Sequence, residues 1–313
     1  MSRYAHSLLQ VQLQPGGGYS LALQGPERQA SAQLLKHRLP GLQPFLELAA
    51  AELVQRGHPQ ACFLVQLHDE APAPPCFRFD APLDPAIAVA GPLIPDPYAL
   101  ASQGYAALRR QFADQPLPPW HERLPVAIWR GSSTGTPALT PANLAHNLRY
   151  QLCAASRQLG PPLDARFTAV VQSPDAASRR ALEQLLLEQQ LLTAKVSPWH
   201  LALHRWILEI DGNVNSWGLL WKLLSGSCVL RVHSPRRQWY HQRLQPWQHL
   251  VPIAANLSDL ADVLAWCQRH PQRCEAIAQA GQALALEVVH QLEQDQRQAV
   301  ARYAATWLRT RAA

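Results

Sequence analysis

The chain has 313 residues, of which 48% are hydrophobic and only 16% are charged. Its 28 lysine and arginine residues against 22 aspartate and glutamate residues give a net charge of +6, and all but three of these cations are arginines. These values exclude a disordered chain and allow about two domains with a sizeable core. The arginine excess suits an anionic ligand or surface, because guanidinium groups bind phosphates and carboxylates with paired hydrogen bonds.

Segment lengths and cysteine spacing argue against an integral membrane protein, a disulfide scaffold and a structural zinc module. The start, MSRYAHSLLQ, holds no apolar run of signal-peptide length, and no segment approaches the ~18 apolar residues of a membrane span. The six cysteines are scattered without a CxxC pair, which argues against a disulfide scaffold and a zinc module. We therefore expect a cytoplasmic protein with reduced cysteines.

The first part of the chain predicts a small set of elements followed by two proline-rich stretches. In order, these elements are a strand over 19–23, helices over 27–35 and 42–56, and a buried strand over 61–67. The prolines of 71–97 and 115–125 favour extended and turn conformations. We place the domain boundary at the second stretch, which gives domains 1–122 and 123–288.

After this boundary, predicted strands alternate with predicted helices. The strands lie over 126–129, 166–171, 205–210 and 228–232, and the helices over 142–158, 178–189 and 216–224. Such alternation is typical of parallel βαβ units, so we expect an α/β fold. Two domains hinged by a proline-rich linker would leave a cleft, the usual ligand position in such folds.

The segment IWRGSSTG over 128–135 is the first candidate for chemistry. It places Gly, Ser and Thr residues in a loop between a strand and a helix, where backbone N–H groups and hydroxyls can approach an anion. The spacing is not that of a Walker loop. An ordinary polar turn is the alternative interpretation.

The segment over 209–232 is the second candidate. Its Asp-Gly-Asn turn follows a strand, and Asn215 or Ser216 is expected to cap the next helix. The start of that helix would face a diphosphate, although any Rossmann-like unit shares this pattern. Asp211 precedes a glycine in the turn, where an aspartate more often satisfies local backbone groups than performs catalysis.

The segment over 236–252 combines Trp239, Tyr240 and Trp247 with several cations. Such residues stack on bases and bind phosphates in single-strand binders, so an arginine-rich nucleic-acid-binding protein is an alternative function. The prolines and the single occurrence favour an ordered loop instead, and no other nucleic-acid motif is present.

In these segments the sequence resembles glycosyltransferase family 90, the group of capsule-associated proteins and protein O-glucosyltransferases. The shared patterns are WRGSSTG at 129–135, IDGN with SW and LLSGSCVL within 210–230, QWYHQRLQPWQHLVPIAANLSDL at 238–260, and IAQAG at 277–281. They cover the chain from about Val126 onward.

This resemblance implies the GT-B architecture, in which two Rossmann-like domains face each other across a cleft. The C-terminal domain would hold a UDP-sugar, and residues 289–313 would form a helix packing back on the N-terminal domain. Relatives are inverting enzymes that use UDP-glucose or UDP-xylose without a bound metal or other cofactor. We expect a hydroxyl acceptor on a glycan or glycolipid, as in lipopolysaccharide-type biosynthesis, with peripheral membrane contact and no nucleic acid. A sugar-nucleotide-binding protein without catalysis is a further alternative.

The resemblance also assigns site residues. The catalytic base would be Asp69, after the strand ending at Leu67, with Glu70 and Asp80 as competitors. Eukaryotic relatives carry a phosphate-binding arginine where this chain has Gly218. Either Lys222, one turn further on, replaces its charge, or the helix N-terminus alone serves the phosphates. Arg130 is part of the shared motif, although a structural role for it is the alternative. The expected donor-binding residues are Arg130, Gly131, Ser132, Thr134, Arg149, Asp211, Gly212, Asn215, Ser216 and Lys222.

Overall fold

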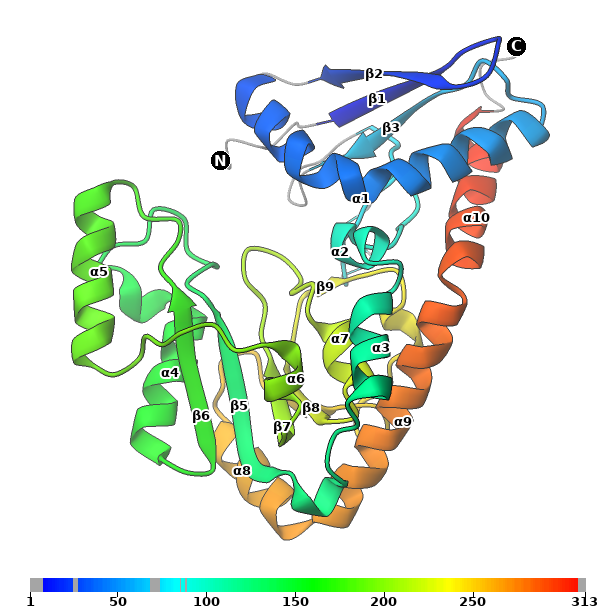
Figure 1. Cartoon of the computed structure of the whole chain (residues 1–313). Helices are drawn as coiled ribbons and strands as arrows, with labels where there is room; N and C mark the ends of the chain where they lie inside the picture. Colours follow the sequence, from blue (N-terminus) through cyan, green and yellow to red (C-terminus); the bar gives the residue numbers. More distant parts are fainter. Residues whose placement is uncertain (1–7, 25–27, 68–73, 85, 88, 309–313) are drawn as a thin grey trace. The chain divides into compact units, whose positions relative to one another are not determined.

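The structure, a computed structural model, describes residues 8–24, 28–67, 74–84, 86–87 and 89–308. These residues divide into two units (Figure 1). The first takes its described residues from 1–106, 235–242 and 287–313, and the second from 107–234 and 243–286. The first boundary between the two units thus lies between residues 106 and 107, whereas the sequence predicts it between residues 122 and 123.

The sheet of the first unit is antiparallel, with the strand order β2-β1-β3. Residues 14–18 connect the first two strands, and a loop this short can join only antiparallel neighbours. The expected Rossmann-like, parallel arrangement of this domain is therefore wrong for its described strands. The first strand was also not predicted. The strands are β1 (Leu8–Leu13), β2 (Tyr19–Gln24) and β3 (Cys62–Gln66).

A single long helix, α1 (Arg28–Gln55), replaces the two helices predicted for this part of the chain. It continues through Pro40 and Pro44, although a proline inside a helix costs about 3 kcal/mol. Five fully buried apolar side chains on its second half provide compensating burial: Leu42, Phe45, Leu46, Ala49 and Leu53. A Cβ on Gly41 would lie 2.7 Å from the Pro97 carbonyl oxygen, so this glycine allows α2 (Pro97–Ala101) to approach closely.

The C-terminal helix α10 (Leu292–Tyr303) belongs to the first unit and packs on α1 (Figure 1). Arg297 forms an ion pair with Glu52 of α1. The ring of Tyr303 stacks on that of Phe77 at a centroid distance of 4.6 Å, and the Tyr303 hydroxyl donates to the Pro75 carbonyl oxygen at 3.3 Å. This unit is therefore completed by residues from both ends of the sequence.

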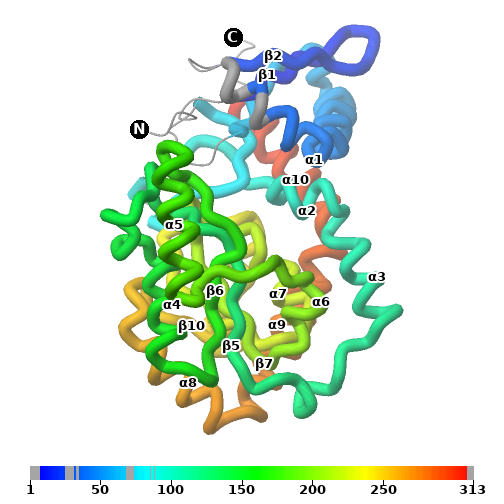
Figure 2. Tube along the Cα trace, turned by 60° about the vertical axis from the view of Figure 1, so that its left-hand side comes forward, coloured from blue at the N-terminus to red at the C-terminus, as the bar shows by residue number. Residues whose placement is uncertain are grey.

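The second unit has a five-stranded sheet with the order β10-β8-β7-β5-β6, in which every pair of neighbours is parallel. Figure 2 shows β6 at one edge of this sheet, beside α4 and α5. Trp120, Trp129 and Trp206 are the largest side chains of its core. The α/β class is confirmed. The strands are β5 (Leu124–Ser132), β6 (Leu163–Ala169), β7 (His204–Glu209), β8 (Cys228–Val232) and β10 (Val251–Ile253).

The helices of the second unit differ from the prediction mainly where they begin. Asn147 caps α4, so this helix starts at Leu148 instead of 142, after a 3₁₀ turn over Leu144–His146. The helix α7 starts at Leu219 instead of 216. The helices are α4 (Leu148–Leu159), α5 (Ala176–Glu188), α6 (Pro198–Leu201), α7 (Leu219–Leu224) and α8 (Leu260–Arg269).

The remaining elements connect or extend these parts. They are β4 (Ala81–Pro82), which pairs antiparallel with β9 (Arg236–Arg237), the helices α3 (Ala106–Asp114) and α9 (Pro271–His290), the 3₁₀ turns Trp120–Glu122 and His241–Arg243, and the π-helical turn Ala304–Leu308.

Candidate active site

Two polar loops of the second unit meet at the carboxyl edge of the parallel sheet. One loop follows β5 and the other follows β7, and the Gly135 N–H donates to the Asn213 side-chain oxygen at 3.0 Å. A Cβ on Gly212 would lie only 2.5 Å from the Thr134 hydroxyl. Glycine at position 212 therefore lets the two loops come together.

Arg149 joins these loops from α4. Its Nη1 donates to the Ser132 carbonyl oxygen at 2.9 Å and to the Thr134 hydroxyl at 2.6 Å. Its Nε donates to the Asp211 carbonyl oxygen at 2.9 Å, and its Nη2 to that of Ile210 at 3.1 Å. These contacts use four of the five guanidinium N–H groups, so one remains for a ligand.

The Arg149 guanidinium is buried and also contacts an aromatic ring. The group lies 5.5 Å from the centroid of the Trp129 ring, and a Cβ on Gly131 would meet that ring at 2.5 Å. Burial lowers the pKa of Arg149, and the nearby carboxylates of Glu209 and Asp211 oppose this shift. Gly131 thus makes room for the aromatic ring on which the cation rests.

Asp211 satisfies polar groups around it, as its place before a glycine predicts. One carboxylate oxygen accepts the Ser216 N–H at 3.1 Å, and the other accepts the Ser234 hydroxyl. Burial raises the pKa of Asp211, whereas these two hydrogen bonds lower it. Ser234 also lies 3.4 Å from the side-chain oxygen of the buried Asn215. The carboxylate therefore fixes the loop after β7.

The start of α7 differs from the expected one. Gly218 is the N-cap residue, and no side chain caps this helix. The Ser216 hydroxyl accepts the Gly218 N–H at 3.4 Å, outside the helix. The expected cap by Asn215 or Ser216 is therefore wrong, because Asp211 holds the Ser216 backbone in the preceding turn.

Lys222 is buried beside Gly218. Its ammonium group forms an ion pair with Glu209 and donates to the Leu208 carbonyl oxygen at 3.1 Å. The Nζ atom lies 3.5 Å from the place where a Cβ on Gly218 would be. The second carboxylate oxygen of Glu209 is buried and has no partner within the described residues. The structure thus brings a cation next to Gly218, the position at which the resemblance leads us to expect an arginine.

Arg130 makes contacts of a structural kind. Its guanidinium binds both carboxylate oxygens of Asp164, at 3.1 and 2.5 Å, and so ties β5 to β6. Arg166 binds the same carboxylate at 3.0 Å. These contacts favour the structural interpretation of Arg130 that the sequence left open. The neighbouring Ser132 hydroxyl has no partner in the described part of the chain.

The three carboxylates considered as catalytic base differ in what the structure says of them. Asp69 and Glu70 lie outside the described residues. Asp80 is buried in the first unit, where it forms an ion pair with Arg236. This pairing disfavours Asp80 as a base, because a base must offer a free carboxylate to its substrate.

The aromatic segment after β8 does not expose all of its rings. Tyr240 is buried and offers no stacking face, whereas Trp247 is 42% exposed and packs edge-on against Trp266 at 4.9 Å. The segment over 236–252 thus provides one exposed ring rather than the row of rings that a single-strand binder would use.

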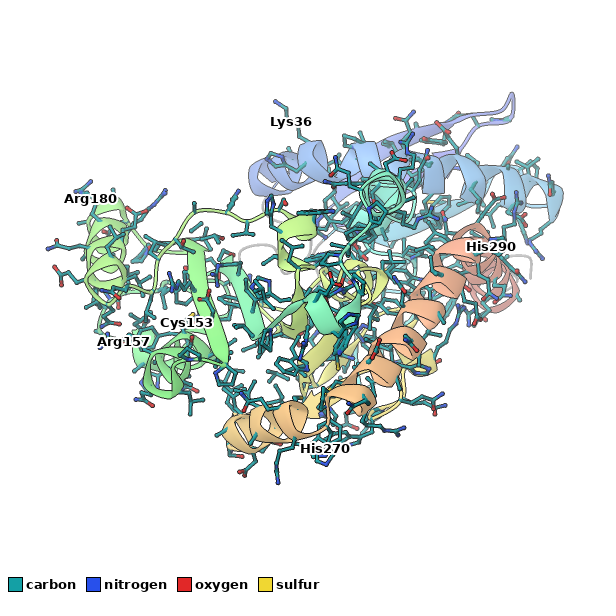
Figure 3. All side chains as sticks on the ribbon, turned by 60° about the horizontal axis from the view of Figure 1, so that its bottom comes forward. Lys36, Cys153, Arg157, Arg180, His270 and His290 are labelled. Carbon is teal, nitrogen blue, oxygen red and sulfur yellow. The ribbon has the colours of Figure 1, made fainter. Side chains whose placement is uncertain are left out.

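Two exposed arginines, Arg157 on α4 and Arg180 on α5, add positive charge to the surface of the second unit (Figure 3).

The described residues contain neither a group of metal-ligand side chains nor a membrane-spanning helix. No three His, Cys, Asp or Glu side chains among them are grouped to hold a metal ion. None of their helices is long and apolar enough to cross a membrane.

One residue of this site was not predicted from the sequence. Asn147 caps α4 by accepting the Tyr150 N–H at 3.0 Å, and its amide nitrogen faces the loop after β5. The available signal was an asparagine two residues before Arg149, a residue type that often precedes a helix. Only the structure shows that the same side chain also contacts the loop.

Comparison with known proteins identifies the family. Residues 105–308 match Glycosyl transferase family 90. The chain belongs to this family. The family agrees with the resemblance found in the sequence, and the parallel α/β unit agrees with the Rossmann-like C-terminal domain that this resemblance implies.

The family 90 chain is similar to several individual proteins. Uncharacterized protein 179R of Invertebrate iridescent virus 6 is 29% identical over 178 residues, which cover 51% of this chain and 15% of that protein. Human protein O-glucosyltransferase 3 is 31% identical over 86 residues, or 28% of this chain and 17% of that protein. The solved structure of Anabaena Alr3699/HepE in complex with UDP-glucose aligns with 15% identity and a TM-score of 0.40, over 64% of this chain and 52% of that chain. The chain thus spans less than a fifth of the first two relatives.

Proposed function

We propose that this family 90 chain is a glycosyltransferase that moves glucose or xylose from a UDP-sugar to a hydroxyl acceptor with inversion. The main observation that supports this function is that the loops after β5 and β7 meet around Arg149 at the carboxyl edge of the parallel sheet. Ligands of parallel α/β sheets bind at this edge. The similarity to human protein O-glucosyltransferase 3 supports glucose as the transferred sugar.

The donor diphosphate would lie against these loops. The Ser132 hydroxyl and the remaining N–H of Arg149 would bind its oxygens, and the Lys222 ammonium would add charge beside Gly218. Charged hydrogen bonds of this kind contribute about 1.5–3 kcal/mol each. In the proposed reaction these cations stabilise the negative charge that develops on the departing UDP without a bound metal.

The transfer itself needs one base. Asp69 would accept the proton of the acceptor hydroxyl while that oxygen forms a bond to the anomeric carbon of the donor sugar. The bond from this carbon to the diphosphate oxygen breaks on the opposite face, and UDP leaves with the electron pair. Attack from the face opposite the leaving group explains inversion.

We propose a glycan or glycolipid acceptor at a membrane surface, to which the exposed arginines on α4 and α5 would be attracted.

The first test combines binding and activity for the full chain and its Asp69→Asn variant. Calorimetric titration with UDP, with and without EDTA, is expected to show equal, chelator-insensitive binding to both proteins. Release of UDP from UDP-glucose or UDP-xylose, in the presence of glycan and anionic glycolipid acceptors, is expected only with the unmodified protein. Asn is nearly the same size as Asp, so the substitution removes the base and little else.

A matched variant, Glu70→Gln, separates the two adjacent carboxylates. It is expected to retain transfer. Loss of activity in Glu70→Gln but not in Asp69→Asn would move the base by one residue. A failure of the unmodified protein to bind UDP, together with salt-sensitive binding of single-stranded RNA, would contradict the proposed function.

A further inference from the structure

The side chain of Asn147 is bound at both of its ends. It is 1% exposed, and its oxygen accepts the Tyr150 N–H at the start of α4. Its amide nitrogen lies 3.3 and 3.2 Å from the carbonyl oxygens of Ser133 and Thr134, and 3.1 Å from the Thr136 hydroxyl. The loop after β5 is therefore wrapped around this one amide group.

The contacts to Asn147 determine which way the peptide N–H groups of the loop point. In a trans peptide the C=O and the following N–H point in opposite directions, and the structure has no cis peptide bond among its described residues. Because the carbonyls of Ser133 and Thr134 face Asn147, the N–H groups of Thr134 and Gly135 face away from it. Both groups are thus directed out of the loop.

These two N–H groups are available to a ligand. The Gly135 N–H donates to exposed side-chain oxygens, those of Asn213 at 3.0 Å and Gln172 at 3.3 Å, which a stronger acceptor can displace. The Thr134 N–H has no acceptor within the described residues. Two adjacent outward N–H groups form a concave donor site of the kind that binds phosphate oxygens.

We propose that Asn147 is a positioning residue that turns the Thr134 and Gly135 N–H groups toward the diphosphate of the donor. The inference rests on the proposed function. Asn147 itself does not touch the ligand, and it acts by holding the carbonyls on the inner side of the loop. Gly135 has a φ of +110°, a conformation that glycine adopts readily. The outward direction of its N–H group therefore depends on two residues, Gly135 for the backbone conformation and Asn147 for the contacts to the carbonyls.

The two ends of Asn147 allow its roles to be separated. Serine and aspartate cap helices about as well as asparagine, but neither supplies the amide donor. Asn147→Ser and Asn147→Asp are expected to fold and to weaken UDP binding at least about tenfold, the effect of one lost charged hydrogen bond. Binding of uridine, which has no phosphate, is expected to stay unchanged in both variants.

The matched control is Asn143, in the preceding turn. This side chain accepts the Thr140 N–H at 2.8 Å and donates to the Ala138 carbonyl oxygen at 3.2 Å, so Asn143→Asp removes a similar donor and adds the same charge nearby. It is expected to bind UDP like the unmodified protein. Equal weakening in Asn143→Asp and Asn147→Asp would overturn the proposal, because charge alone would then explain the loss.

A measurement on the unmodified protein does not depend on how the variants fold. Saturating UDP is expected to slow hydrogen exchange at the Thr134 and Gly135 amides by at least about tenfold. Binding of UDP without slower exchange at these two amides would overturn the role of Asn147 and leave the proposed function intact. No UDP binding at all would overturn both.

Discussion

At the scale of single residues, Arg149 shows how one side chain can organise a binding site. Its guanidinium reaches three carbonyl oxygens and one hydroxyl on two loops. No ammonium group can match this, because lysine has three donors on one atom and arginine has five on a planar fork. Most hydrogen bonds of this guanidinium are thus made to groups of the protein itself, where they stabilise the two loops.

This arrangement predicts that Arg149→Lys lowers the free energy of unfolding by about 2–3 kcal/mol, since buried carbonyls lose their donors although the charge remains. Urea unfolding of the full chain measures the effect, and UDP titration of the same variant should show weaker binding. Arg157→Lys, at an exposed position of the same helix, is the control and should change neither value. Equal stability of the two variants would contradict the role of Arg149 in joining the loops after β5 and β7.

The sequence predicted which residues gather at this site better than it predicted their partners. The loop after β5, Arg149 and the Asp-Gly turn are found at the carboxyl edge of the sheet, where strand order places them. The pairing of Lys222 with Glu209, 13 positions away, depends on how α7 packs over β7, which no local pattern encodes. The ion pair of Asp80 with Arg236 has the same origin, because it joins residues 156 positions apart.

At the scale of elements, the prediction succeeded where local signals and packing agree. The strand over 228–232 was predicted with its observed ends, and β7 lies within one residue of its predicted range. The two helices predicted in place of α1 show the opposite case. Prolines signal an interruption, yet the buried apolar residues on its second half keep one helix continuous.

The turn before β10 links stability to pH. His249 is buried in this turn, and its Nδ1 accepts the Gln245 N–H at 3.0 Å, which a protonated imidazole cannot do. Burial lowers the pKa of His249 below its usual 6.5. The folded protein therefore binds this proton less readily than the unfolded chain, so stability should fall as pH drops below about 6.5.

His249→Gln is expected to reduce this loss of stability between pH 7.5 and pH 5.5. Urea unfolding at the two pH values measures it. Part of the loss should remain, because burial also lowers the pKa of His204. His121→Gln, at an exposed site, is the control. An unchanged pH dependence in His249→Gln would show that this turn does not contribute to it.

At the scale of the whole molecule, each of the two units has its own core, and the first is assembled from three separate stretches of sequence. Tyr303 illustrates the dependence of the first unit on its last stretch, since its ring stacks on Phe77 and is only 4% exposed. Composition and strand order predicted two units, but they do not reveal that residues 235–242 belong to the first.

Tyr303→Ala is expected to destabilise the first unit by about 3–5 kcal/mol, the usual effect of removing a large buried aromatic ring. Hydrogen exchange followed by mass spectrometry should show faster exchange in β1, β3 and α1, with little change in β5, β7 and β8. Tyr98→Ala, at a residue of the same unit that is 62% exposed, should leave exchange unaltered in both sets of strands. Uniformly faster exchange in both units would contradict the assignment of Tyr303 to the core of the first unit alone.

The packing of α10 on α1 also has a consequence for synthesis on the ribosome. Domains generally fold in the order in which they emerge, but here every residue of the second unit is translated before α10. The unit that starts first therefore finishes last, and the part of α1 that packs against α10 stays uncovered until α10 has left the ribosome. A chaperone that binds nascent chains would find its target in this interval.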